Sequence, residues 1–354
     1  MTMNEITYDN DAADLIDHLP FLKELEGKHI FITGGTGLIG RTLLSALHQA
    51  NEKYALGLVI GVLVRDKNKY KEQVGADWFK NTVVVEGNLE SLNSVTLEKN
   101  FDTVIHMASP TGSFDMANHP VKVINGIVSG TQQILDFAVK NNASSFLFLS
   151  TMEIYGPTTK EDGDIVESFG SRVDLSSVRS SYPEAKRLAE VMANSYGFEN
   201  NMKVMTARLT QTFGPGVSYN DQRMFADFGR RTIENEKIVL HTKGDTVRSY
   251  IDVKDAVAAL LYILLKGQNM QAYNVANSDA TISVADFARK MLKIGGRNPE
   301  VDLVYDLKDA QSLGYAPVFY MKLATEKMEN LGWKPEFSID EMIERLLISM
   351  GDNA

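Results

Sequence analysis

Short apolar runs alternate with longer amphipathic stretches from about residue 28 to residue 210. The apolar runs are rich in Val, Ile, Leu and Phe, which is typical of strands that helices cover on both faces. Strands are predicted at His29–Thr33, Leu58–Val64, Thr82–Val85, Thr103–His106, Ser145–Ser150 and Lys203–Arg208. Helices are predicted between them, at Leu38–Ala50, Val121–Lys140 and Tyr182–Tyr196. This alternation predicts an α/β fold with a Rossmann-type, doubly wound parallel sheet.

The pattern changes after Arg208. Gly214-Pro215-Gly216 interrupts it, and further helices with irregular links are predicted at Met224–Asn235, Val253–Leu265, Ser283–Lys293 and Ile339–Ser349. Residues 1–27 have apolar positions at helical spacing, which predicts one or two short helices packed on the main domain. We therefore expect an N-terminal helical extension (1–27), a main domain (28–210) and a smaller mixed lobe (211–354) that is interleaved with it.

A glycine-rich turn connects the first predicted strand to the first long helix. Its three glycines are spaced three residues apart. In such a turn the first glycine permits the tight bend, the second lets the backbone approach a pyrophosphate, and the third lets the helix pack on the strand. The helix N-terminus adds free N–H groups and a positive dipole. The predicted dinucleotide site contains Gly34, Thr36, Gly37, Leu38, Ile39 and Gly40. The main domain is thus expected to bind NAD(P).

The choice of nicotinamide depends on the end of the second predicted strand. An acidic residue there usually holds the ribose diol of NAD, whereas an arginine suits the 2′-phosphate of NADP. Arg65 occupies this position and Asp66 follows it. NADP is therefore favoured over NAD, and the alternative is that Asp66 turns inward and serves NAD.

Tyr182 and Lys186 are four residues apart in a predicted helix and so share one face. This spacing places the lysine ammonium near the phenol and near a nicotinamide ribose. A positive charge there, together with the cationic ring of an oxidised cofactor, lowers the pKa of a tyrosine from its usual value of about 10. We therefore expect Tyr182 to act as an acid or base near neutral pH and Lys186 to assist it, with both contacting the cofactor.

The glycine turn and the Tyr-x-x-x-Lys spacing resemble the extended short-chain dehydrogenases of the nucleotide-sugar epimerase/dehydratase group. The resemblance extends over residues 28–345. It implies that Asn88-Leu89 touches the adenine, although the family usually has Asp-Leu there. It also implies that Ala108-Ser109 lines the nicotinamide side, with Pro110 facing the substrate. Thr151 matches the residue that hydrogen-bonds the substrate oxygen which Tyr182 deprotonates.

The two residues after Thr151 separate the subgroups of that family. Nucleotide-sugar 4,6-dehydratases have an Asp-Glu pair there, whereas this chain has Met152-Glu153. A thioether cannot donate a proton, so 4,6-dehydration is expected to be impaired, while Glu153 is a catalytic candidate. UDP-glucuronate decarboxylases have Ser-Glu here and are the closest subgroup, although they usually carry an acid in place of Arg65.

The resemblance assigns substrate binding to the lobe over 211–354. Gln211 stands where the family has an asparagine that contacts the sugar nucleotide. Arg248 matches an arginine that binds the diphosphate, for which a guanidinium fork is suited. Arg223 is a second candidate anion contact, and His241 lies where the family often has an aromatic residue near the nucleobase.

The composition of the chain disfavours several classes of binding partner and of chemistry. The chain of 354 residues has a net charge of −10, which disfavours nucleic acid and anionic membranes as partners. No apolar run is long enough to cross a bilayer, and no signal peptide is apparent. The chain has no cysteine, which excludes disulfides, thiolate catalysis and cysteine-based metal sites and fits a cytoplasmic location. No metal site is predicted.

The motifs together predict an NAD(P)-dependent enzyme that transfers hydride at C4 of a nucleotide-linked sugar, as an epimerase or a UDP-glucuronate-decarboxylase-like enzyme. An NADPH-dependent 4-keto-sugar reductase is an alternative that Arg65 would favour, and a reductase of non-nucleotide carbonyls resembling the dihydroflavonol reductases is a weaker one. A non-catalytic dinucleotide sensor is the alternative of another class, against which the Thr151–Tyr182–Lys186 set argues. The family often dimerises through the helices at Val121–Lys140 and Tyr182–Tyr196, so the resemblance implies a homodimer.

Overall fold

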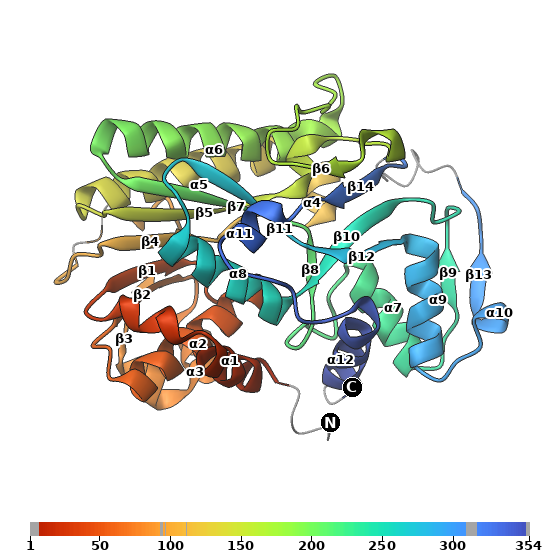
Figure 1. Cartoon of the computed structure of the whole chain (residues 1–354), viewed down its shortest axis with the longest axis horizontal. Helices are drawn as coiled ribbons and strands as arrows, with labels where there is room; N and C mark the ends of the chain where they lie inside the picture. Colours follow the sequence, from red (N-terminus) through yellow and green to blue (C-terminus); the bar gives the residue numbers. More distant parts are fainter. Residues whose placement is uncertain (1–6, 93–94, 96, 111, 309–316, 352–354) are drawn as a thin grey trace.

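The centre of the protein is a seven-stranded parallel sheet in the order β11-β7-β5-β4-β1-β2-β3 (Figure 1). The computed structural model describes residues 7–92, 95, 97–110, 112–308 and 317–351. The strands are β1 (His29–Thr33), β2 (Val59–Val64), β3 (Thr82–Glu86), β4 (Thr103–His106), β5 (Ser145–Thr151), β7 (Lys203–Leu209) and β11 (Gln271–Val275). The six strands predicted from the sequence are the first six of these, with ends that differ by at most one residue. The predicted doubly wound α/β fold is confirmed.

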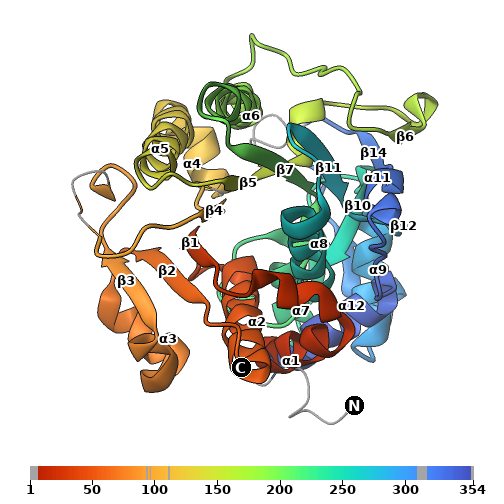
Figure 2. The same cartoon turned by 60° about the vertical axis from the view of Figure 1, so that its left-hand side comes forward.

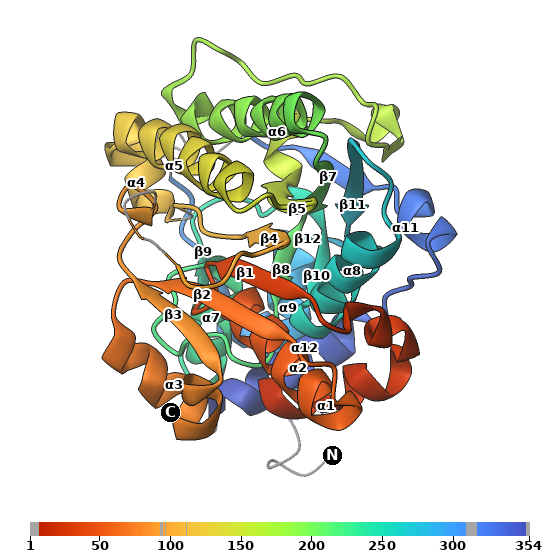
Figure 3. The same ribbon diagram turned by 90° about the vertical axis from the view of Figure 1, so that its left-hand side faces the viewer.

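Helices cover both faces of this sheet (Figure 3). Along β1, Ile30 and Ile32 point into one core, and Phe31 points into the other, as the alternation of a strand requires. The first core contains α2 (Leu38–Tyr54) and α8 (Val253–Lys266), and the second contains α5 (Pro120–Lys140) and α6 (Ser181–Asn200). The remaining helices of this part are α3 (Lys67–Lys80), beside β3, and the short α4 (Ser113–Asn118).

The sheet order reverses beside β1, because β2 and β4 lie on its two sides. In open α/β sheets a crevice forms at such a point, outside the carboxyl ends of the strands, and ligands bind there. The glycine turn follows β1 at this edge, and the segments after β4 and β5 leave the sheet at the same edge. The fold therefore brings the predicted cofactor and catalytic segments to one place.

The C-terminal lobe has its own sheet and core. Its main sheet has the order β12-β10-β14-β6, with β8 paired to β10, and a two-stranded sheet joins β13 to β9. These strands are β6 (Asp164–Ile165), β8 (Gln211–Phe213), β9 (Ile238–Leu240), β10 (Val247–Asp252), β12 (Asn277–Ser283), β13 (Leu303–Tyr305) and β14 (Tyr320–Leu323). The helices are α7 (Met224–Ile233), α9 (Val284–Ile294), α10 (Pro299–Asp302), α11 (Glu326–Asn330) and α12 (Ile339–Gly351). The chain passes between the two lobes more than once, because after β10 helix α8 packs on the first sheet and β11 joins it as an edge strand.

The N-terminal segment folds onto the first domain and approaches the last helix (Figure 2). It forms α1 (Tyr8–His18) and a 3-10 turn, η2 (Pro20–Leu25), and residues 1–6 lie outside the described part of the chain. Thr7 caps α1 by accepting a hydrogen bond from the Asn10 backbone N–H. The apolar positions of this segment, Leu15, Ile16, Leu19, Leu22 and Leu25, are buried in the core around α2 and α8. None of the described helices is long and apolar enough to cross a membrane.

Candidate active site

The glycine turn has the backbone geometry that a dinucleotide site requires. Gly34 has a φ of +78°, and a Cβ atom there would lie 2.7 Å from the backbone nitrogen of Ala108. A Cβ atom at Gly40 would overlap the Gly34 carbonyl oxygen, so only glycine lets α2 pack this closely. A Cβ atom at Gly37 would meet only ordinary contacts within the protein. Thr36 and Gly37 are also exposed, so this part of the turn faces outward.

Gly37 caps α2 without a side-chain hydrogen bond, so the first N–H groups of the helix remain available beside the turn. Free N–H groups and the positive end of a helix dipole are suited to a pyrophosphate. Leu38 and Ile39, the next two residues, are half-buried. The residues present therefore fit a dinucleotide, with the pyrophosphate at the start of α2.

Arg65 and Asp66 follow β2, at the position that selects between NAD and NADP. The Asp66 carboxylate caps α3 and accepts hydrogen bonds from the backbone N–H groups of Asn68 and Lys69, both at 2.9 Å. Arg65 is exposed. One oxygen of the Asp66 carboxylate accepts both cap bonds, and Asp66 is exposed as well, so both side chains are able to meet a ribose or its phosphate.

The segments after β3 and β4 are only partly free for a ligand. The Asn88 side-chain oxygen, which is predicted to face adenine, accepts a hydrogen bond from the Ser91 backbone N–H at 2.9 Å within its own turn. Leu89 is half-buried and packs toward Gly130 of α5. After β4, the Ala108 N–H donates to the Thr33 hydroxyl at 3.2 Å. The Ser109 hydroxyl is buried and has no hydrogen-bond partner among the described residues, as expected of a group that meets a ligand.

His106 and Pro110 lie at the two ends of the segment that joins β4 to the loop after it. Pro110 is half-buried, and Gly126 of α5 lies so close to it that a Cβ atom there would be 3.0 Å from its ring. His106 is a core histidine, because its Nδ1 lies 2.7 Å from the Thr33 hydroxyl and burial lowers its pKa to about 3. A neutral, buried imidazole of this kind does not serve as a catalytic base at neutral pH.

Thr151, Tyr182 and Lys186 come together where β5 meets α6. All three side chains are buried, and the Thr151 hydroxyl lies near enough to the Tyr182 phenol to lower its pKa in part. Lys186 donates a hydrogen bond of 2.8 Å to the backbone carbonyl of Leu149 on β5, and its ammonium lies 4.7 Å from the centre of the Phe148 ring. Helix α6 therefore presents the tyrosine and the lysine to the end of β5, as their four-residue spacing predicts.

The electrostatics of the trio differ from the sequence-based expectation. Burial and the Glu153 carboxylate raise the pKa of Tyr182, although the nearby Thr151 hydroxyl opposes this. Burial lowers the pKa of Lys186 to about 7. In the protein alone the lysine is directed to the β5 backbone and desolvation dominates both groups. A lower pKa of Tyr182 beside a bound, oxidised cofactor stays a prediction.

Glu153 lies in the 3-10 turn η4 (Met152–Tyr155), directly after Thr151 on β5. Burial raises the pKa of its carboxyl, and the positive charges of Arg179 and Arg248 lower it in part. Met152, in contrast, is buried in the core and accepts a hydrogen bond from the Thr210 hydroxyl through its sulfur at 3.2 Å. The turn therefore presents one acid, rather than two, beside Tyr182.

Arg179 is a site residue that the sequence reasoning did not find. It lies in the turn η6 (Val178–Ser180), three residues before Tyr182, and is half-buried. A basic residue in a serine-rich segment carries no periodic pattern, so its position immediately before the helix of Tyr182 and Lys186 was the only available signal. Its charge acts on Glu153 together with that of Arg248.

The predicted substrate residues fall into two groups. Arg248 lies on β10, and its Nε is buried without a partner among the described residues. Gln211 lies on the adjacent strand β8, where it pairs with Tyr250. Arg223 instead forms an ion pair of 2.6 Å with Asp221, and the ring of His241 lies 3.1 Å from the carbonyl oxygen of Asp306. Arg248 and Gln211 are therefore available on adjoining strands, whereas Arg223 and His241 already have protein partners.

Comparison with known proteins gives a consistent result. A model of the NAD dependent epimerase/dehydratase family matches residues 30–276. UDP-glucuronic acid decarboxylase 1 of Xenopus tropicalis is 26% identical over 330 residues, which cover 92% of this chain and 73% of that protein. The structure of a UDP-glucose 4-epimerase from Thermotoga maritima with UDP-glucose has a TM-score of 0.76 at 21% identity, covering 92% of this chain and 99% of that one. RMD from Pseudomonas aeruginosa, complexed with NADPH, has a TM-score of 0.71 at 20% identity with the same coverage.

Proposed function

Because the chain belongs to the NAD dependent epimerase/dehydratase family, we propose that it oxidises and reduces C4 of a nucleotide-linked sugar with a bound nicotinamide. The observation that carries the proposal is the meeting of Thr151, Tyr182 and Lys186 at the carboxyl end of β5. This end lies at the same edge of the sheet as the glycine turn after β1. A protein that only senses a dinucleotide needs the turn but not the trio.

Each member of the trio has a role that its contacts support. The bound nicotinamide supplies a hydride acceptor and donor for C4. Tyr182 takes the proton of the sugar hydroxyl, and Thr151, whose hydroxyl lies beside the phenol, holds the same sugar oxygen. Because burial raises the pKa of Tyr182, the phenol keeps its proton until positive charge enters the site. Lys186, with a pKa lowered to about 7, exchanges a proton near neutral pH and is suited to relay it.

Within this class we propose a nucleotide-linked uronic acid as substrate and its decarboxylation as the outcome. Oxidation at C4 places a ketone two bonds from the C6 carboxylate. The C5–C6 bond then breaks, CO2 leaves, and the electron pair passes into an enolate on the C4 oxygen. Glu153 has a raised pKa and returns a proton to C5, while Arg179 and Arg248 supply positive charge for the anionic substrate. Final return of hydride to C4 completes the cycle without net oxidation.

Support for this outcome comes from the turn after β5 and from the relatives. Met152 is turned into the core, which removes the second acid that a 4,6-dehydratase is expected to use. The relative from Xenopus tropicalis is named a UDP-glucuronic acid decarboxylase, and uridine is therefore the first nucleotide to test.

We propose NADP as the preferred cofactor. One carboxylate oxygen of Asp66 caps α3, and Arg65 is exposed at the end of β2, where a guanidinium suits a 2′-phosphate. This same observation favours the second candidate function, an NADPH-dependent 4-keto-sugar reductase. A reductase releases its cofactor at each turnover, whereas a decarboxylase or epimerase regenerates it.

The proposed assembly is a homodimer built on α5 and α6. These helices pack against each other on one face of the sheet (Figure 3), yet they leave large apolar side chains exposed. The exposed residues on them are Val121, Ile124, Leu188, Val191 and Phe198. A second copy that contributes the same two helices would cover this surface in a four-helix contact. A cytoplasmic location completes the proposal and fits the absence of cysteine.

One experiment separates these candidates. The purified protein is incubated with UDP-, dTDP-, GDP- and CDP-linked sugars and uronic acids, with and without added NADP(H), and the products are identified by mass spectrometry. We expect UDP-glucuronate to lose CO2 without stoichiometric cofactor, and Tyr182→Phe to abolish the reaction. Consumption of NADPH by a 4-keto sugar instead identifies a reductase. A protein that turns over none of these substrates, or a Tyr182→Phe variant with full activity, overturns the proposal.

A further inference from the structure

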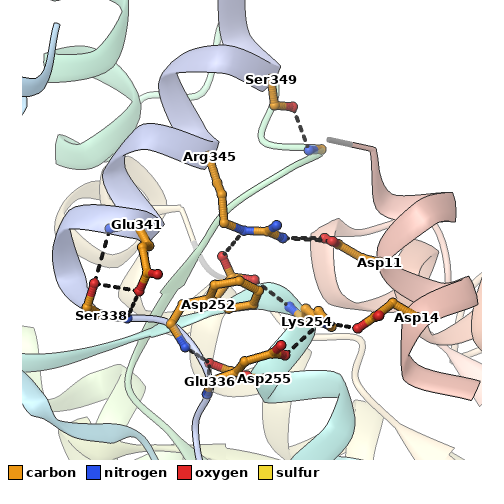
Figure 4. Close-up of polar contacts among 12 residues, drawn as sticks. Asp11, Asp14, Asp252, Lys254, Asp255, Glu336, Ser338, Glu341, Arg345 and Ser349 are labelled. Atoms are coloured by element: carbon orange, nitrogen blue, oxygen red, sulfur yellow. Dashed lines mark hydrogen bonds and ion pairs between the residues drawn. The ribbon is translucent and has the colours of Figure 1, made fainter. Parts of the chain in front are cut away.

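Three distant parts of the chain meet in one buried ion cluster (Figure 4). Arg345 of α12 donates hydrogen bonds of 2.8 and 2.7 Å to the two carboxylate oxygens of Asp11 on α1. It also donates a hydrogen bond of 3.1 Å from Nε to Asp252, the last residue of β10. All three side chains are buried, with exposed fractions of 5% for Asp11, 0% for Asp252 and 6% for Arg345.

A second contact of the same kind lies next to the cluster. Lys254, at the start of α8, bridges Asp14 of α1 and Glu336, which precedes α12. The Asp255 carboxylate accepts hydrogen bonds from the backbone N–H groups of Glu336 and Phe337 at 3.0 and 3.3 Å. Helix α1, strand β10 and the segment leading into α12 are therefore tied together at several points.

Burying these charges costs free energy, so stability by itself does not explain the cluster. Two buried carboxylates share one guanidinium, and burial raises the pKa of Asp11 and raises that of Asp252 to about 6. Buried ion pairs contribute little net stability, because desolvation offsets their attraction, and in some proteins such groups serve instead to fix the relative positions of the parts they join. A functional role for the cluster therefore requires a part of the protein whose position depends on this junction.

Strand β10 is such a part, because it carries Arg248. The guanidinium Nε of Arg248 has no partner among the described residues, so the placement of this side chain depends on its strand. Asp252 closes that strand four residues later and also caps α8 by accepting the Lys254 N–H at 2.8 Å. Through β10 the cluster also holds β8, since Tyr250 pairs with Gln211. Arg248 and Asp252 are about 13 Å apart along the strand, and the pairing of β10 with β12 shifts register between them, at Ser249 and Tyr250.

We propose that Asp11 is a positioning residue for the sugar-nucleotide site: it holds Arg345 and thereby Asp252, and so sets the place of Arg248 on β10. The inference rests on the proposed function of Arg248 as the diphosphate contact. It assigns a role to α1 that the family match does not contain, because Asp11 and Arg345 both lie outside residues 30–276 whereas Asp252 lies within them.

The test compares Asp11→Asn with Asp17→Asn in the full chain. Asp17 lies on the same helix but pairs with Lys53 at the surface, so it controls for the loss of one α1 carboxylate. We expect Asp11→Asn to raise the KM for the sugar nucleotide and the Kd for UDP about tenfold. The kcat and the Kd for NADPH should stay within about twofold of wild type, and Asp17→Asn should change none of these values. A role in stability alone would lower the melting temperature and leave the KM and the UDP affinity unchanged, and this result overturns the proposal.

Two further measurements keep the test decisive. Arg345→Lys retains the charge but not the fork that reaches both carboxylates, so it is expected to fold and to weaken UDP binding in the same direction. Amide hydrogen exchange measures, without any ligand, how firmly the ion cluster holds β10. Asp11→Asn should raise the exchange rates of the β10 amides and leave those of the β2 amides unchanged. If wild type binds no nucleoside diphosphate but Asp11→Asn still raises the exchange rates of the β10 amides, the proposed function has failed. If Asp11→Asn leaves these exchange rates unchanged, the positioning role has failed.

Discussion

The Asp255 carboxylate gives a stability prediction with a clear sign. This side chain is buried, and its hydrogen bonds come from backbone N–H groups rather than from a cation. Burial, followed by repulsion from Asp252, raises its pKa from 3.8 to about 7. The proposed perturbation is Asp255→Asn, which keeps an oxygen that can accept both N–H bonds and removes the charge.

The magnitude follows from the difference between the two pKa values. Between about pH 4 and pH 7 the folded protein holds one more proton at Asp255 than the unfolded chain does. The stability from this group is therefore fully present at the low end of the window and is lost as the pH rises through about 7. Each pH unit corresponds to about 1.4 kcal/mol while the proton difference is complete, and this difference falls to half a proton at pH 7, so the loss between pH 5 and pH 7 is about 2 kcal/mol.

The assay is urea unfolding of wild type and Asp255→Asn at intervals from pH 5 to pH 8. His48 and His106, whose pKa values are lowered to about 4 and about 3, oppose the trend below pH 6.5 in both proteins, so the difference between the two free energies is the measured quantity. We expect this difference to shift toward the variant by about 2 kcal/mol as the pH rises from 5 to 7. Asp340→Asn, which removes an exposed carboxylate, is the control. Parallel profiles for wild type and Asp255→Asn would falsify the reasoning.

Three further predictions concern the cofactor, the chemistry and the assembly. Arg65→Ala should weaken NADPH binding by about 10- to 100-fold and leave NADH binding within about twofold, as measured by fluorescence titration; equal affinities in wild type and variant contradict the cofactor assignment. Glu153→Gln should lower the kcat for decarboxylation about 100-fold or more with little change in KM, and an unchanged kcat removes Glu153 from the chemistry. Val191→Glu should convert a dimer to a monomer in light scattering, and an unaltered mass places the interface elsewhere.

Much of the fold could be predicted because its signals are local. The strands β1, β2, β3, β4, β5 and β7 are apolar runs, and the long helices between them have regular periodicity. Strand β11 was not predicted, because Gln271 and Asn274 interrupt its apolar pattern and it enters the first sheet from the second lobe. Its position depends on pairing with β7, a contact between segments that are distant in sequence.

The positions of the main site residues could be predicted from the sequence, but their electrostatics could not. Thr151, Tyr182 and Lys186 meet as their spacing and strand position predict, but the pKa of Tyr182 does not follow from spacing, because burial outweighs the nearby lysine. Arg179 and the partner of Arg223 were missed for a related reason. Sequence spacing shows which side chains share a face, whereas ion pairing and desolvation depend on the packed environment of each charge.

The contact between Asp11 and Arg345 has a consequence for biosynthesis. The two residues are 334 positions apart, so Asp11 leaves the ribosome long before its cation does. During this interval β1 to β7 can already pair, while the carboxylates of Asp11 and Asp252 have no guanidinium between them. Burial of α1 against the finished sheet is therefore expected to be one of the last steps of folding, and chains that stop before α12 should expose α1 to proteases.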